Sequence, residues 1–200
     1  MGGSFNPPHA AHAMIAREAL KRLRLDRLWW VVTPGNPLKA NSGLPPQSAR
    51  MQACRALATH PRMEVTGFEA ALGSPYTAVT LAFLKKRYPA TRFIWVMGAD
   101  NLAQFHRWQD WRGIARSWPI AVVDRPGWRL KALAGQGAQS LGPRRLPEAQ
   151  AASLARCQPP VWTFLTSRLS PLSSTALRAE AAAEHNAKAL PRREVPLEGG

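Results

Sequence analysis

The feature that most constrains the fold is a regular alternation of short β-rich runs with helix-length stretches. The β-rich runs are dominated by Val, Ile, Leu and Trp and lie at residues 27–33, 63–66, 92–97, 119–123 and 161–165. Stretches with apolar positions three and four residues apart lie at 13–25, 46–60, 77–88 and 102–117. Strands that alternate with helices pair in parallel, and near-continuous apolar strands are typical of a sheet covered on both faces. The pattern predicts an α/β fold, a Rossmann-like doubly wound parallel sheet with helices on both faces.

The N-terminal segment, residues 2–12, combines glycines, prolines and two histidines just before the first helical stretch. Gly2 and Gly3 allow backbone N–H groups to approach a ligand closely. His9 and His12 are three residues apart, so they lie on one face of the first helical turn. A helix N-terminus favours anions because its first N–H groups are unpaired and its dipole is positive there. The segment therefore predicts a site for phosphate chemistry.

The sequence begins at this turn, although a doubly wound fold normally has its first, central strand before the glycine-rich turn. A buried central strand cannot be lost without leaving backbone groups unpaired. We therefore expect that the first strand is missing at the N-terminus and that the natural protein begins several residues upstream of Met1.

Length and composition bound the domain organisation. A chain of 200 residues is long enough for one domain with a sizeable core. The last residues are polar, contain Pro191 and Pro196 and end in two glycines. We expect a single domain over residues 1–183 and a flexible tail over residues 184–200. The segment 125–150, rich in Gly, Pro and Arg, is expected to be a long loop or an excursion from the alternating pattern.

The net charge of +15 favours an acidic partner, which could be nucleic acid, an anionic membrane or a phosphorylated small molecule. The arginines are spread over the whole chain, so we do not expect a dedicated nucleic-acid-binding arm. The alternative explanation of the charge is a solvated, arginine-rich surface. The apolar runs are too short to span a bilayer, and no signal peptide opens the sequence. Cys54 and Cys157 lack metal-ligand spacing. We expect a cytoplasmic protein that uses no membrane and no protein-held metal.

Several motifs in a fixed order point to a family. After the N-terminal turn come Asn-Pro-Leu-Lys at residues 36–39, Met-Gly-Ala-Asp-Asn-Leu at 97–102, Phe-His-Arg-Trp at 105–108, Val-Val-Asp-Arg-Pro-Gly at 122–127 and Leu-Ser-Ser-Thr-Ala-Leu-Arg at 172–178. Together they resemble the nucleotidyltransferases with a His/Thr-x-Gly-His signature and, among these, the bacterial nicotinate-nucleotide adenylyltransferases. The resemblance spans residues 2 to about 180.

The resemblance implies a reaction in which the adenylyl group of ATP passes to nicotinate mononucleotide, giving deamido-NAD and pyrophosphate. A phosphate monoester is largely ionised at neutral pH, so the nucleophile needs no general base. Catalysis would rest on positioning and electrostatics, without a covalent intermediate. Mg²⁺ is expected with ATP, because it bridges nucleotide phosphates with few protein ligands.

The resemblance also assigns roles to individual residues. The catalytic set would be His9, His12, Lys39 and Arg178. The nicotinate nucleotide would contact Thr77 and stack on Trp108, with Trp111 a neighbouring alternative. The residues expected to bind ATP are Gly2, Gly3, Ser4, Phe5, His12, Lys39, Gly98, Asp100, Arg125, Ser173, Ser174, Thr175 and Arg178.

Some of these residues have a simpler structural explanation. Ser173, Ser174 and Thr175 are good helix N-caps, and Asp100 could cap a helix that begins at Asn101. Arg50 is a plausible helper at the site.

The sequence departs from the family pattern at two places. Ala11 stands where the signature has glycine, and Pro75 and Val79 depart from the Ser-Tyr-Thr-x-Asp-Thr pattern. The alternatives are an adenylyltransferase for nicotinamide mononucleotide or phosphopantetheine, or a basic nucleic-acid-binding protein. Oligomeric state does not follow from the sequence.

Overall fold

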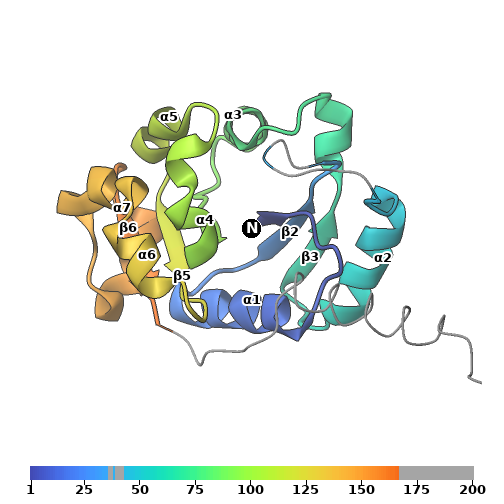
Figure 1. Cartoon of the computed structure of the whole chain (residues 1–200), viewed down its shortest axis with the longest axis horizontal. Helices are drawn as coiled ribbons and strands as arrows, with labels where there is room; N and C mark the ends of the chain where they lie inside the picture. Colours follow the sequence, from blue (N-terminus) through green and yellow to red (C-terminus); the bar gives the residue numbers. More distant parts are fainter. Residues whose placement is uncertain (36–37, 39–42, 167–200) are drawn as a thin grey trace, which may run out of the picture.

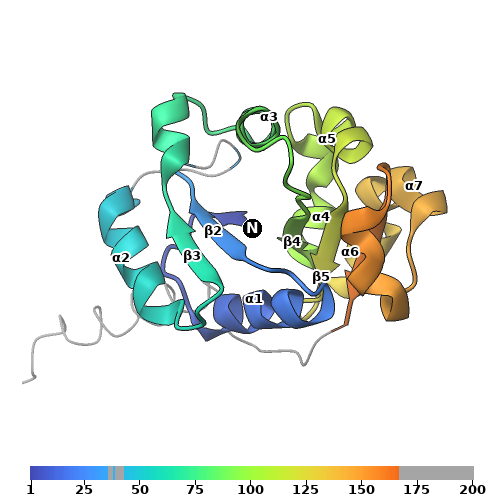
Figure 2. The ribbon, with the colours of Figure 1, turned by 180° about the vertical axis from the view of Figure 1, so that it is seen from behind.

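The computed structural model describes residues 1–35, 38 and 43–166, and its strands form two parallel sheets (Figures 1 and 2). One sheet has the order β1-β2-β3 and the other β4-β5-β6. All adjacent strands within each sheet run parallel. The strands are β1 (Gly2–Gly3), β2 (Leu28–Val32), β3 (Met63–Thr66), β4 (Trp95–Gly98), β5 (Ile120–Val123) and β6 (Trp162–Leu165).

Helices connect the strands and flank both sheets. The α-helices are α1 (Ala10–Arg22), α2 (Gln47–Leu57), α3 (Thr77–Arg87), α4 (Ala99–Ala103), α5 (Trp111–Ser117), α6 (Arg129–Ala134) and α7 (Gln136–Leu141). The 3₁₀ helices are η1 (Phe68–Leu72), η2 (Phe105–Arg107), η3 (Gly142–Arg144) and η4 (Glu148–Arg156). In Figure 1, α1 lies below both sheets, α2 lies beside β3, and α6 and α7 lie on the side of β5 and β6. The predicted α/β fold with parallel strands and flanking helices is confirmed.

Two groups of buried side chains hold these layers together. The first joins α1 to β2 and β3 and includes Leu20 and Trp30. The second surrounds β4 and β5 and includes Leu102, Phe105 and Phe164. Burial of such apolar surface is the main favourable contribution to the free energy of folding of these layers.

The expectation that the first strand is missing needs correction. Gly2 and Gly3 form a two-residue strand that pairs in parallel with Val31 and Val32. The N-terminal amine of Met1 donates a hydrogen bond to the Trp29 carbonyl at 2.9 Å. The short strand has a ladder to β2, whereas the described residues show no ladder between β1 and β4. The Trp95 side chain of β4 lies against Gly2 of β1, because a β-carbon on Gly2 would be 2.9 Å from Cη2 of Trp95.

The helix predicted over residues 102–117 is divided in the structure. Helix α4 ends at Ala103, and α5 begins only at Trp111. Asp110 starts α5 as its N-cap, because its Oδ1 accepts a hydrogen bond from the Gly113 N–H at 3.1 Å. The apolar periodicity continued across this break because α4 and α5 both face the same core.

The segment 125–150 was expected to be a loop, and this prediction was wrong. It contains α6, α7 and η3, which are too short to show a clear apolar period. Ala132, Ala138 and Leu141 are buried against α4 and η2. Short helices here cover the second sheet.

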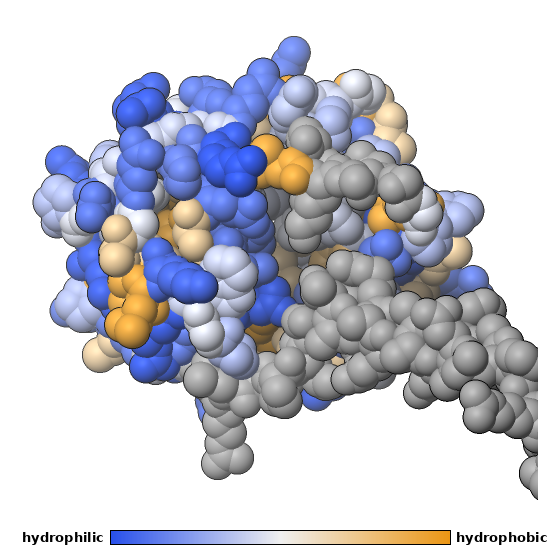
Figure 3. All heavy atoms as spheres, viewed as in Figure 1, coloured by the Kyte–Doolittle hydropathy of each residue, from blue (hydrophilic) through white to orange (hydrophobic). Residues whose placement is uncertain are grey.

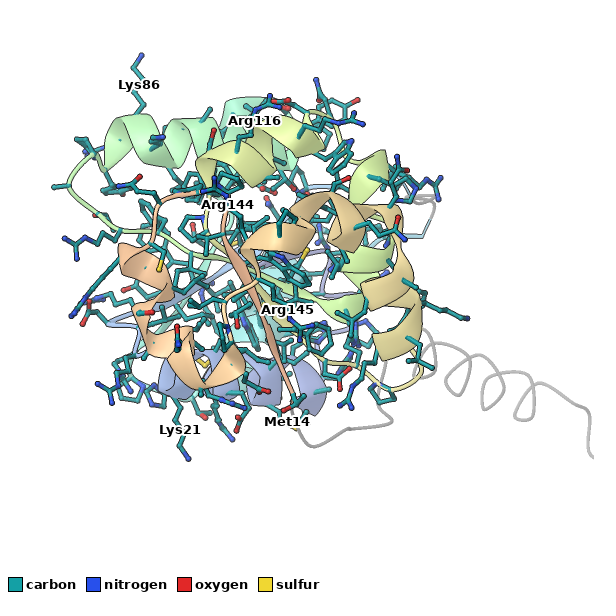
Figure 4. The ribbon with its side chains drawn as sticks, turned by 90° about the vertical axis from the view of Figure 1, so that its left-hand side faces the viewer. Met14, Lys21, Lys86, Arg116, Arg144 and Arg145 are labelled. Carbon is teal, nitrogen blue, oxygen red and sulfur yellow. The ribbon has the colours of Figure 1, made fainter. Side chains whose placement is uncertain are left out.

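The described basic residues are spread over several elements. Figure 4 shows Lys21 on α1, Lys86 on α3, Arg116 on α5 and Arg144 on η3 at separate places on one side of the molecule. On the face in Figure 3, the hydrophobic residues drawn in colour form small separate spots among hydrophilic ones. Among the described residues, no helix combines the length and apolar character needed to cross a bilayer.

Gly137 tests the packing of α7 against α4. A β-carbon there would lie 2.9 Å from the Leu102 backbone carbonyl. We expect Gly137→Ala to lower the free energy of unfolding by about 1–3 kcal/mol through overpacking. Ser140→Ala, at an exposed position of the same helix, is the matched control and should change it by about 0.5 kcal/mol or less. Urea unfolding checks both, and equal effects of the two substitutions would contradict this packing.

Candidate active site

The glycine-rich turn at residues 2–5 is held in an unusual conformation. The Thr33 N–H donates to the Gly3 carbonyl at 3.0 Å. Phe5 has a left-handed backbone with φ of 46°, a conformation that costs a non-glycine residue about 1–3 kcal/mol. Its buried ring contacts Trp30 and His12, with ring centroids 5.1 and 5.0 Å away. The buried ring holds the turn in place at the start of α1.

His9 and His12 lie together at the N-terminus of α1, as the sequence predicts. His9 is the N-cap residue, and its backbone N–H donates to Nδ1 of His12 at 3.2 Å. Because Nδ1 of His12 accepts this bond, a neutral His12 carries its proton on Nε2. The two rings are 3.9 Å apart, and both nitrogens of the buried His9 ring lack a partner among the described residues. An unpaired buried donor is costly, and a ligand oxygen would satisfy it.

Both histidines are neutral near pH 7. The pKa of His12 is lowered to about 3, mainly by burial and also by the neighbouring His9 and Arg125, while the hydrogen bond from the His9 backbone opposes the shift. Burial also lowers the pKa of His9 to about 4, with a smaller effect of Arg125. The pair therefore offers neutral N–H donors at the helix terminus.

Asp100 and Arg125, predicted separately to bind ATP, form an ion pair. Arg125 Nη1 lies 3.0 Å from Asp100 Oδ2, and both side chains are largely buried. The other carboxylate oxygen of Asp100 is buried without a partner among the described residues. A β-carbon on Gly98 would lie 2.4 Å from Asp100 Oδ1, so a side chain there would displace the Asp100 carboxylate. The structure thus brings Gly98, Asp100 and Arg125 together at the end of β4 and β5.

Asp124 supports Arg125 and was missed by the sequence analysis. Its buried carboxylate accepts a hydrogen bond from the Arg125 backbone N–H at 2.9 Å. The other oxygen accepts from Nε of Arg129 at 2.7 Å. The signal was present, because an aspartate at the end of a buried strand directly before Arg125 is placed to fix the turn.

A pocket of about 420 Å³ lies where the segments after β2 and β3 meet. Its lining includes Gly35, Glu69, Ser74 and Pro75. Thr77 follows two residues later as the first residue of α3 and is half-buried. Thr77 is therefore close in the chain to the pocket lining but is not part of it.

Glu69 is a buried acid that the sequence analysis also missed. Thr80 Oγ1 donates to Glu69 Oε1 at 2.5 Å, which ties α3 to η1. Burial raises the pKa of the Glu69 carboxyl, while hydrogen bonds from Thr80 and Thr33 oppose that shift. Its sequence neighbours are ordinary helix formers, so no local pattern distinguished it.

Trp108 lies at the end of η2 and is half-buried. Its ring meets Phe105 and Trp95 edge-on, with centroids 5.4 and 6.5 Å away. Trp95 in turn lies against Gly2, so one ring separates Trp108 from the glycine-rich turn. Trp111 is buried against Phe105 and belongs to the core.

Some predicted site residues lie outside the described part of the chain. These are Lys39, Ser173, Ser174, Thr175 and Arg178. The proposed tail, residues 184–200, is also outside it, so the domain boundary at residue 183 stays a prediction. In the described ranges, no three His, Cys, Asp or Glu side chains gather as a metal site.

Comparisons with known proteins agree with this arrangement. The model of the cytidylyltransferase-like family matches residues 1–180. A probable nicotinate-nucleotide adenylyltransferase of Brucella abortus is 54% identical over 177 residues, which cover 88% of this chain and 91% of that protein. The corresponding protein of Agrobacterium fabrum is 55% identical, with coverage of 88% and 95%.

A solved structure shares the fold. It is a Plasmodium falciparum nicotinic acid mononucleotide adenylyltransferase complexed with NaAD, which matches with a TM-score of 0.67 at 16% identity over 89% of this chain and 80% of that one. At that identity the likeness concerns the fold alone. The sequence matches carry the assignment: the chain belongs to the cytidylyltransferase-like family and, within it, to the nicotinate-nucleotide adenylyltransferases.

Proposed function

We propose that the protein transfers the adenylyl group of ATP to nicotinate mononucleotide and releases pyrophosphate. The observation that carries this proposal is the pair of neutral histidines at the N-terminus of α1, whose ring nitrogens are available to a ligand. The chain is also 54% identical to a probable nicotinate-nucleotide adenylyltransferase. A phosphate oxygen of the mononucleotide attacks the α-phosphorus of ATP, and the bond to the pyrophosphate oxygen breaks.

In this proposal the α1 terminus holds the ATP phosphates. Nε2–H of His12 donates to a phosphate oxygen whose negative charge grows in the transition state, and His9 donates to a neighbouring one. The positive end of the α1 dipole and the unpaired N–H groups of the first turn of α1 attract the same phosphates. His12 is half-buried and its Nδ1 is engaged with the backbone, so its orientation is set before the ligand arrives.

The adenosine part would lie toward Asp100 and Arg125. An aspartate carboxylate accepts hydrogen bonds from sugar hydroxyls, and the free Oδ1 of Asp100 has this capacity. Arg125 would contact adenine or phosphate. Thr77 and Trp108 are assigned to the pyridine nucleotide, where an aromatic ring can stack on a flat ligand. The remaining phosphate contacts in this proposal come from Lys39, Ser173, Ser174, Thr175 and Arg178.

Mg²⁺ would enter this site already bound to ATP, because the N–H donors at the start of α1 bind phosphate oxygens and do not bind a cation. The ion would be held mainly by the phosphate oxygens of ATP, with His9 and His12 donating to oxygens that it leaves free. When bound, it would neutralise charge on the phosphates.

The acceptor identity can be tested directly. We expect ATP- and Mg²⁺-dependent pyrophosphate release with nicotinate mononucleotide, and much less with nicotinamide mononucleotide or phosphopantetheine. Equal or better use of another acceptor would overturn the proposed substrate. Pyrophosphate release with none of them, together with tight and steeply salt-dependent DNA binding, would favour the nucleic-acid alternative.

His12 can be tested with two substitutions that separate its two nitrogens. His12→Ala removes both, whereas His12→Asn keeps an acceptor near the Nδ1 position and removes the Nε2 donor. Both should lower kcat by roughly 10²-fold or more, because a charge-stabilising donor is lost. His60→Ala is the control and should leave kcat unchanged, because His60 precedes β3 and so lies at the opposite edge of the parallel sheet from the first turn of α1. A folded His12→Asn protein with the kcat of the wild type would refute the role of Nε2.

A further inference from the structure

Arg50, on the first turn of α2, is a buried cation that contacts backbone carbonyls. Its side chain is 3% exposed. Nη1 donates to the Ser4 carbonyl at 2.6 Å and to the Thr33 carbonyl at 2.9 Å. Nε donates to Pro45 at 2.9 Å, and Nη2 donates to Pro34 at 3.4 Å. These carbonyls belong to the glycine-rich turn, the end of β2 and the segment before α2.

The position of the Ser4 contact is significant because β1 is so short. The ladder between β1 and β2 ends with the bond from Thr33 N–H to the Gly3 carbonyl. The next carbonyl, that of Ser4, therefore lies beyond the last rung. Nη1 of Arg50 donates to both the Ser4 and the Thr33 carbonyls, so the guanidinium continues to join the two segments where the pairing of β1 with β2 ends.

The same face of α2 makes a second contact of this kind. Gln47, three residues before Arg50, donates through Nε2 to the Val32 carbonyl at 2.7 Å and to the Gly67 carbonyl at 3.3 Å. Gln47 thus joins the ends of β2 and β3, and Arg50 joins the ends of β1 and β2. Arg55, on the same helix, is exposed and takes no part.

We propose that Arg50 is a positioning residue for adenylyl transfer, which holds the turn at residues 2–5 in register with the end of β2. This inference rests on the proposed function, because the turn is where the ATP phosphates would bind. A planar guanidinium holds its five donors in a fixed fork that reaches these carbonyls from three nitrogens, whereas the three donors of a lysine ammonium all radiate from one nitrogen. Displacement of such a turn by about 1 Å can cost about 10²-fold in rate.

Kinetics of Arg50→Ala and Arg50→Lys test the proposal, with Arg55→Ala as the matched control. For Arg50→Ala we expect kcat/KM for ATP to fall by about 10²-fold per folded molecule. Added guanidinium ion, below denaturing concentrations, should restore part of that loss and should not accelerate Arg55→Ala. Arg50→Lys should lose nearly as much, because its charge is kept but its geometry is not. A role in stability alone would lower the melting temperature and leave kcat/KM of the folded protein unchanged.

Hydrogen–deuterium exchange provides a readout that does not depend on the activity. In Arg50→Lys we expect faster exchange of the amides of residues 3–6 than in wild type or Arg55→Ala, with exchange in the middle of α1 unchanged. Unchanged exchange at residues 3–6 and unchanged kcat/KM in both Arg50 variants would overturn the proposal. If wild type transfers no adenylyl group, the proposed function fails, and the exchange result still decides whether Arg50 holds the turn. If Arg50→Ala does not fold, Arg50→Lys decides both questions.

Discussion

The attachment of a two-residue strand, β1, to the edge of β2 is the constraint on which the site depends. Gly2 and Gly3 pair with Val31 and Val32, and this short contact fixes where the glycine-rich turn begins. The left-handed Phe5 follows two residues later, and α1 begins at Ala10. A strand of this length contributes few hydrogen bonds, so side-chain contacts must also hold the segment in place. Two such contacts are the Phe5 ring against Trp30 and the hydrogen bond from the Arg50 guanidinium to the Ser4 carbonyl.

Burial decides what kind of chemistry the histidines can perform. The low pKa values of His9 and His12 make them neutral donors, so the cations that attract polyanionic substrates must come from other residues. Arg125 is one such residue, and it opposes protonation of both rings. The histidines therefore act as neutral hydrogen-bond donors of fixed orientation, and nearby arginines supply the positive charge that attracts the substrates.

Much of the fold could be predicted from the sequence because buried parallel strands produce apolar runs and their connecting helices show an apolar period. The run at residues 119–123 became β5, and the helix expected at 77–88 became α3. The break between α4 and α5 was missed because a helix cap, Asp110, outweighs a periodicity that continues across it. The short helices at 125–150 were missed because six residues carry less than two apolar periods.

The site was predictable where a local motif carries the chemistry, and less so where contacts join distant segments. His9 and His12 could be placed on one helical turn from their spacing alone. The pairing of Asp100 with Arg125 joins two strands, and the contacts of Arg50 join three segments, so neither follows from a local pattern. Glu69 belongs to the same class, since only the folded chain brings Thr80 to it.

The protonation and tautomeric state of His12 test the central claim most directly. Nitrogen-15 NMR of the histidine rings in the free protein, recorded from pH 7 to pH 5, reports which ring nitrogen carries the proton. The structure predicts that His12 stays neutral over this range with the proton on Nε2, because its pKa is lowered to about 3 and Nδ1 accepts the His9 N–H. A proton on Nδ1, or a doubly protonated His12 ring above pH 6, would contradict the account.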